Sequence, residues 1–231
     1  MRIVAAQQET GPYDWATDAP VSPPRRPSAP RVAETGASRA AKNLMLETGE
    51  DDDLVALVAD GDHAAFRVLM ARHMNRAIRV AQGVLGVPAE ADDVAQEAFL
   101  RVWRHAGSFD PRRARFTTWL HRIVVNLAID RRRLPRSESL ELAENLADGA
   151  QDALAGLIDD DERRAVARAL AQMPERFRAA ITLFHFEGLS GRDCARALDI
   201  GESAFESLLT RARAALRRSI AGATRNQGRE S

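Results

Sequence analysis

The chain has 231 residues, 45% of them hydrophobic, which is enough for one large domain or two small ones. Its 33 basic and 33 acidic residues cancel, so the net charge indicates no class of partner. A single cysteine excludes an internal disulfide. The sequence has no apolar run long enough to cross a membrane and no signal-peptide core at its start. We therefore expect a cytoplasmic protein that is not inserted in a membrane.

The N-terminal part of the chain differs in composition from the rest. Residues 1–48 are rich in proline, alanine, serine and arginine, which predicts a disordered extension. From Asp51 the apolar residues repeat at helical spacing. The pattern predicts a first domain over residues 49–134, with helices at 51–59, 64–84, 89–105 and 116–133.

A second helical unit follows an acidic stretch. Residues 135–160 predict a flexible acidic linker, and residues 161–222 predict a second domain, followed by a tail over 223–231. Helices are expected at 161–172 and 175–187, then two more within 190–218. The sequence has no strand-like alternation, so the predicted fold is all-α, with two helical domains.

The last two helices have the pattern of a helix-turn-helix. Ser190 and Asp193 predict an N-terminal cap, and Asp199-Ile200-Gly201 has turn chemistry. An apolar stripe through Phe205 predicts the buried face of the second helix. Its outer face would then enter a DNA major groove. An ordinary helical hairpin has similar periodicity, and remains an alternative for this segment taken alone.

The charges are segregated along the chain. Residues 99–136 are rich in arginine, whereas residues 138–162 contain acids and no Lys or Arg. The exposed side of helix 116–133 and the preceding loop have residue types that contact phosphates and base edges. That loop, residues 107–115, either cradles an unstacked base or only connects two helices. Trp103 and Trp119 lie on apolar stripes, so we expect core packing rather than base stacking.

No residue pattern indicates an active site. The acidic face of residues 92–104 indicates a solvated helix face, because a di-metal site would require a histidine three residues after Glu97. The five histidines form no metal-ligand pattern, and His121 is expected at the surface beside Trp119. We expect no metal, no cofactor and no enzymatic activity.

Four motifs in order resemble a known family. They are DLVALVADGDHAAFRVLMARH (53–73), DDVAQEAFLRVWR (92–104), FTTWLHRIVVNLAIDRRR (116–133) and QMPERFRAAITLFHFEGLSGRDCARALDI (172–200), the last followed by the helix 205–218. Together they resemble a bacterial RNA polymerase sigma factor of the extracytoplasmic-function group, over about residues 51–220. The chain departs from the family at the turn glycine, which is Asp199 here, at the serine cap, which is Gly201, and at a basic position, which is Glu206.

The resemblance implies a role for each surface. Helix 92–104 would bind the β′ clamp of core RNA polymerase, through Asp92, Asp93, Gln96, Glu97 and Arg101. Helix 116–133 and its loop would recognise and melt the −10 promoter element, through Phe109, Arg112, Arg113, Arg115, Arg122, Asn126, Asp130 and Arg133. The last helix would read the −35 element, through Ser203, Glu206, Ser207, Thr210, Arg211 and Arg213.

The resemblance also implies partners. They are core polymerase (the β′ and β subunits), promoter DNA and an anti-sigma factor acting in a stress or envelope response. Two alternatives remain from the residues themselves. A regulator that binds duplex DNA without polymerase would leave the −10-like helix and the acidic linker unexplained. A sigma-like adaptor that sequesters a regulator is mildly favoured by Glu206, but the arginines at the end of that helix weigh against it.

Overall fold

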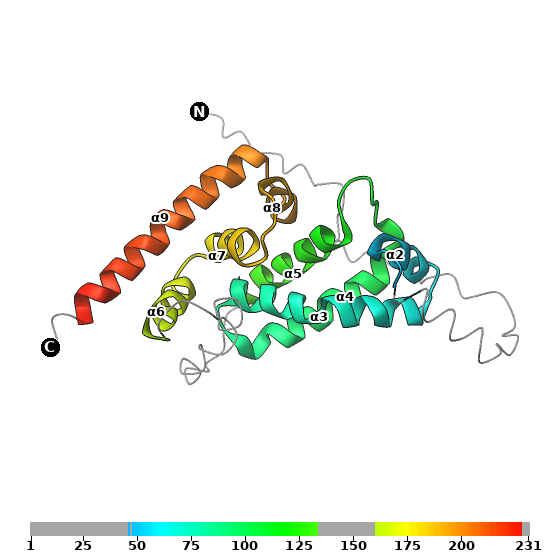
Figure 1. Cartoon of the computed structure of the whole chain (residues 1–231), viewed down its shortest axis with the longest axis horizontal. Coiled ribbons are helices and arrows are strands. Elements are labelled where there is room, and N and C mark those ends of the chain that lie inside the picture. The colour runs from blue at the N-terminus through cyan, green and yellow to red at the C-terminus, as the bar shows by residue number, and fades with distance from the viewer. Residues whose placement is uncertain (1–45, 47, 134–159, 228–231) are drawn as a thin grey trace, which may run out of the picture.

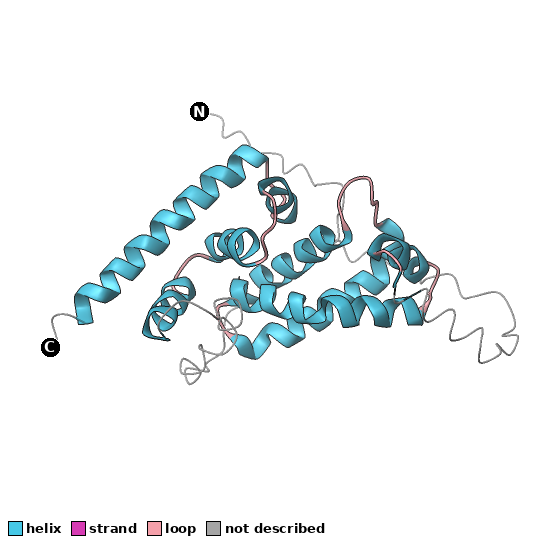
Figure 2. Cartoon of the chain, in the orientation of Figure 1, coloured by secondary structure: helices cyan, strands magenta, loops and turns pink. Residues whose placement is uncertain are grey.

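A computed structural model describes residues 46, 48–133 and 160–227 of the chain. Its secondary structure there is entirely helical (Figure 2). The predicted linker over 135–160 lies outside these residues except for residue 160, and the predicted N-terminal extension lies outside them except at positions 46 and 48. Leu46 is helical and buried, and its carbonyl oxygen accepts a hydrogen bond from Arg72 Nη2 at 3.4 Å. Packing therefore begins slightly before the predicted start of the first domain.

The first unit contains four α-helices: α2 (Asp51–Ala59), α3 (His63–Leu85), α4 (Ala91–His105) and α5 (Phe116–Arg133). Asp62 starts α3, because its carboxylate accepts hydrogen bonds from the backbone N–H groups of Ala64 and Ala65 at 2.7 and 3.1 Å. Gly86 ends α3 with a left-handed backbone, φ +72°. A 3₁₀ turn over Pro88–Glu90 precedes α4, where the sequence predicted an uninterrupted helix from residue 89.

The second unit contains α6 (Asp160–Ala171), α7 (Glu175–Ile181), α8 (Gly191–Ala197) and α9 (Glu202–Gln227). The predicted cap of α8 is confirmed, because Ser190 Oγ accepts a hydrogen bond from the N–H of Asp193 at 3.1 Å. The helix predicted over 175–187 ends at Ile181 and continues as a π-helical turn, η3 (Thr182–Phe186). The last helix runs to Gln227, beyond the predicted domain end at 222.

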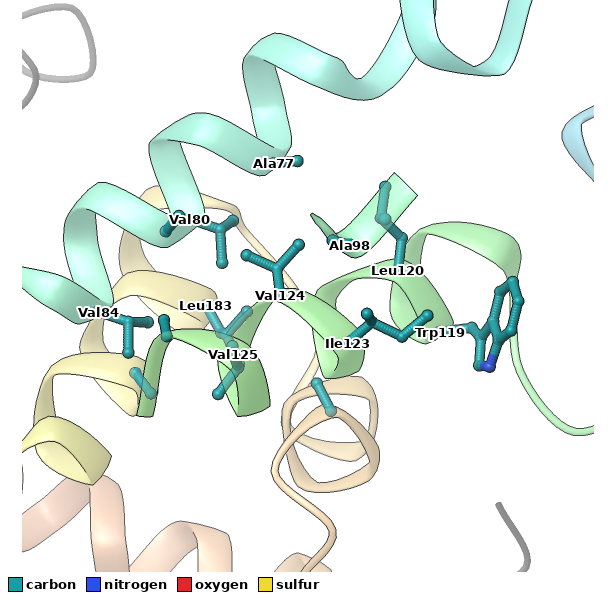
Figure 3. Close-up of a cluster of buried hydrophobic side chains, with 14 of the residues drawn as sticks. Ala77, Val80, Val84, Ala98, Trp119, Leu120, Ile123, Val124, Val125 and Leu183 are labelled. Carbon is teal, nitrogen blue, oxygen red and sulfur yellow. The ribbon is translucent and has the colours of Figure 1, made fainter. Parts of the chain in front are cut away.

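The two helical units pack directly against each other. Helix α5 contacts α7 and α8, and α3 contacts α7 and η3. Figure 1 shows α7 and α8 lying between α5 and the long helix α9. Leu183 of η3 lies beside Val84 of α3 and Val124 and Val125 of α5 (Figure 3), and all four side chains are fully buried. The sequence predicted two domains but gave no sign of this continuous core.

Two arginines join the units where α3 and α6 end. Arg178 of α7 is completely buried, and its Nε donates to the carbonyl oxygen of Val84 at 2.7 Å while Nη1 donates to that of Ala171 at 2.9 Å. Arg132 of α5 donates to the carbonyl oxygen of Leu85 at 2.6 Å and to that of Ala171 at 3.4 Å. The last carbonyl groups of a helix lack partners within it, and the helix dipole places negative charge there. Both guanidinium groups therefore stabilise helix ends that belong to different units.

Candidate nucleic-acid interface

The outer face of α4 is polar, with one apolar residue in it. Asp92, Asp93 and Gln96 are exposed, as the sequence predicted, while Glu97 and Arg101 are half-buried and form an ion pair at 3.4 Å. Leu100 lies on the same face, one helical turn from Gln96, and is 47% exposed. Leu100 was not among the predicted contact residues, although its position outside the apolar stripe was a usable signal. The face combines exposed acids with an accessible apolar side chain.

The loop before α5 is held in place by aromatic packing and by one aspartate. The Phe109 ring lies 5.3 Å from the Trp119 ring and 6.3 Å from the Phe116 ring, measured between centroids. Trp119 is buried, as predicted. Asp110 accepts hydrogen bonds from the backbone N–H and the Nε of Arg112, and the Arg112 guanidinium lowers the pKa of Asp110. The loop is thus anchored at Phe109.

The predicted loop arginines line a cavity between the two units. Arg112, Arg113 and Arg115 are exposed, and they face the turn between η3 and α8 across a cavity of about 640 Å³. Arg76 of α3 and Arg196 of α8 also line it, together with two acids, Glu187 and Asp193. The cavity is therefore rich in guanidinium groups from both units.

The structure corrects the predicted exposure of Arg122. Its side chain is only 12% exposed and forms an ion pair with Asp199 of the helix-turn-helix, Nη2 to Oδ2, at 3.1 Å. The prediction was wrong because the sequence did not show that α8 covers this side of α5. Asn126 is half-buried and Asp130 is exposed, whereas the side chain of Arg133 lies outside the described residues.

His121 is buried rather than on the surface, which is a second correction. It is 1% exposed, and neither ring nitrogen has a hydrogen-bond partner among the described residues. Burial lowers the pKa of His121 to about 3, and the positive charges of Arg76 and His73 act in the same direction. The prediction failed because α5 is enclosed by α3 on one side and by α7 and α8 on others.

The outer face of α9 carries the predicted polar residues. Ser203, Glu206, Ser207, Thr210 and Arg211 are all exposed. Thr210 Oγ1 donates to the carbonyl oxygen of Glu206 at 2.9 Å, and Arg211 Nε donates to that of Ser207 at 3.2 Å. Arg213 differs from these, because its Nε donates to His185 Nε2 at 3.1 Å and its guanidinium lies over the Phe184 ring. The face toward the protein is closed by Phe205, which is buried as predicted, and by Ala212, which is also buried.

The described residues contain no group of three or more metal-ligating side chains that could hold an ion. Among the helices that the structure describes, none is long and apolar enough to span a bilayer.

Comparisons with known proteins match both units. The family model of sigma-70 region 2 matches residues 69–137, and that of sigma-70 region 4 matches residues 163–216. We use "region 2" and "region 4" below for the helical units α2–α5 and α6–α9.

Individual relatives are matched over most of their length. The ECF RNA polymerase sigma-E factor of Escherichia coli K12 is 33% identical, over 74% of this chain and 95% of its own. The ECF sigma factor SigM of Mycobacterium tuberculosis H37Rv is 37% identical, over 73% and 83%. The solved structure of CnrH in complex with the cytosolic domain of CnrY has a TM-score of 0.56 and 30% identity, and covers 74% of this chain and 97% of that one. This chain therefore belongs to the extracytoplasmic-function group of sigma factors, the transcription initiation factors of bacterial RNA polymerase.

Proposed function

We propose that each of the three surfaces takes one part in initiation. The exposed face of α4 docks on the β′ clamp, the loop and α5 hold the −10 element, and the outer face of α9 reads the −35 duplex. The single observation that best supports this assignment is the arrangement on α4. The exposed Leu100 shares one face of the helix with Asp93, Gln96 and Glu97, and an apolar side chain among polar ones is typical of protein interfaces.

The α9 face supports duplex recognition by its residue types. Hydroxyl and guanidinium groups contact phosphates and base edges in the major groove. Glu206 is the exception, since a carboxylate is repelled by phosphate and accepts a hydrogen bond from cytosine N4. We therefore propose a −35 preference that differs from that of relatives with a basic residue at this position.

The domain boundaries and the cellular setting are also part of this proposal. We assign polymerase and −10 binding to residues 49–134 and −35 binding to 161–222, in a protein that acts in the cytoplasm. We further propose control by an anti-sigma protein, because CnrH, a relative in both sequence and fold, is recorded in complex with part of a second protein, CnrY. No catalytic role is assigned to any residue.

The test is transcription in vitro. Purified core RNA polymerase is mixed with the full chain and a fragment library of the host genome, and transcript starts are mapped. We expect initiation from a small promoter set, and loss of both initiation and core binding in the Asp93→Arg/Glu97→Arg variant. A matched control, Asp53→Arg/Asp60→Arg, reverses two exposed charges on or next to α2 and should retain activity.

The two other candidate functions give different results. Tight duplex binding without core binding would contradict the proposal and indicate a stand-alone regulator. Absence of both would indicate the adaptor. Circular dichroism of the α4 variant guards against misfolding, because Asp93 also contacts Arg131 at 3.3 Å.

A further inference from the structure

We propose that Asp199 is an intramolecular latch, a residue whose carboxylate holds region 4 against the −10 helix α5 and so keeps Arg122 from DNA. The proposal rests on the −10 role assigned to Arg122 above.

The backbone at Asp199 is the first observation. Its φ is +55°, and among the described residues it is the only non-glycine residue with a positive φ. Glycine adopts this left-handed conformation without a Cβ penalty, whereas an aspartate there is tolerated at some cost. A residue that is kept in an unfavourable conformation suggests that its side chain has a use.

The partner of that side chain is the second observation. Asp199 reaches from the turn after α8 to Arg122 on α5, with 3.1 Å between Oδ2 and Nη2. The same contact region is lined by Thr118 and Trp119 of α5 and by Ala195 of α8. Only 12% of the Arg122 side chain is exposed, so this guanidinium faces region 4 rather than solvent.

Region 4 and DNA therefore compete for Arg122. A phosphate or base at the outer face of α5 requires the space that α8 occupies, so the docked arrangement and the DNA-bound arrangement exclude each other. The apparent affinity for the −10 strand equals the intrinsic affinity multiplied by the fraction of molecules in the open arrangement. Any contact that favours docking therefore lowers this apparent affinity.

Two further contacts between the regions limit how much the loss of the Asp199 charge can shift the balance between docked and open forms. Glu187 of region 4 forms an ion pair with Arg76 of α3, and Arg76 Nη2 also donates to the Glu187 carbonyl oxygen at 2.9 Å. Arg178 holds the end of α3. Since Asp199 is half exposed, removing its charge should shift the balance between docked and open forms by only about two- to fivefold.

The experiment measures docking and DNA binding separately in the full chain. Spin labels are placed on Ala89→Cys in region 2 and Ala204→Cys in region 4, both exposed, and pulsed dipolar spectroscopy gives their distance distribution. Cys194 is buried and remains unlabelled. Binding of a fluorescent single-stranded oligonucleotide with the non-template −10 sequence is followed by anisotropy.

Two substitutions separate charge from backbone strain. Asp199→Asn removes the charge and keeps a residue that tolerates the left-handed conformation, while Asp199→Gly removes both charge and strain. The matched control is Glu202→Gln, which removes the ion pair with Arg192 inside region 4. We expect both Asp199 variants, and not the control, to raise the open population and the oligonucleotide affinity about two- to fivefold.

Any other result contradicts a particular part of the proposal, either the latch or the masking of DNA binding. If Asp199→Gly stabilises the protein and leaves the distance distribution unchanged, Asp199 is only a turn residue and the latch is wrong. If the variants open without gaining affinity, masking of DNA binding is wrong. Arg122→Ala then shows whether the fault lies in the proposed function, because an unchanged oligonucleotide affinity in that variant means that Arg122 is not a −10 contact.

Discussion

Gly83→Ala should destabilise this protein although it improves a helix. Gly83 lies inside α3, where alanine ordinarily gains about 0.5–1 kcal/mol. A Cβ at this position would lie 2.5 Å from Thr182 Oγ1 and 2.7 Å from Thr182 Cγ2. Thr182 is buried in η3 and has a stiff β-branched side chain, so it cannot turn away easily. Overpacking of this kind costs about 1–3 kcal/mol.

The net effect follows from these two magnitudes. We expect a loss of about 1–2 kcal/mol in the free energy of unfolding. For a chain of this size that corresponds to a Tm lowered by about 2–8 °C, measured by circular dichroism. Gly107→Ala is the control, because a Cβ at that position would meet no atom within 4 Å.

A second substitution tests whether the contact itself is responsible. Thr182→Ala removes both clashing atoms, so the double variant should recover stability beyond additivity, with a coupling of about 1 kcal/mol. If Gly83→Ala alone raises the Tm, the higher helix propensity of alanine stabilises the protein and no clash with Thr182 offsets it. That result would refute the close approach of η3 to α3, and with it the docked arrangement of regions 2 and 4.

Three other predictions concern single residues. The folded-state pKa of His121, about 3, is below its ordinary 6.5, so its contribution to stability is complete above pH 6.5 and falls at lower pH by at most about 1.4 kcal/mol per unit. His121→Met should therefore flatten the dependence of unfolding free energy on pH between 6.5 and 5, and an unchanged slope would contradict the burial. Asp62→Ala should cost about 1 kcal/mol in urea unfolding, because two backbone N–H groups at the start of α3 lose their acceptor. Burial raises the pKa of the Cys194 thiol to about 12, so it should resist a disulfide reagent at pH 8 until the protein is unfolded; rapid reaction of the folded chain would contradict this.

Much of the local structure was predictable because it depends on near neighbours in sequence. Helices α2 and α5 have the predicted bounds, since their apolar stripes and flanking breakers lie within a few residues of one another. The Ser190 cap and the turn at Asp199 follow from the same short-range chemistry. Most predicted residues on the outer faces of α4 and α9 are exposed because no other described helix covers them, whereas Glu97, Arg101 and Arg213 are half-buried.

The predictions that failed concern residues whose surroundings come from distant parts of the chain. His121 and Arg122 lie on a helix whose periodicity shows one strongly apolar face, and nothing in that pattern indicates that α3, α7 and α8 together also cover its other sides. The complete burial of Arg178 was equally hidden, since arginine is ordinarily a surface residue. Its partners are carbonyl groups at helix ends. Every residue has a backbone carbonyl, so the sequence does not indicate which of them will bind a side chain.

The sequence by itself determined the helical elements, their caps and the family, because these depend on periodicity, local hydrogen bonding and ordered motifs. Only the tertiary structure decided how regions 2 and 4 meet. That contact depends on a close approach at Gly83, on two arginines at the ends of α3 and α6, and on an aspartate in a left-handed turn reaching α5. The partners that meet across the two regions are 39 to 99 residues apart in the chain, and their interaction energies exist only once the two units are side by side.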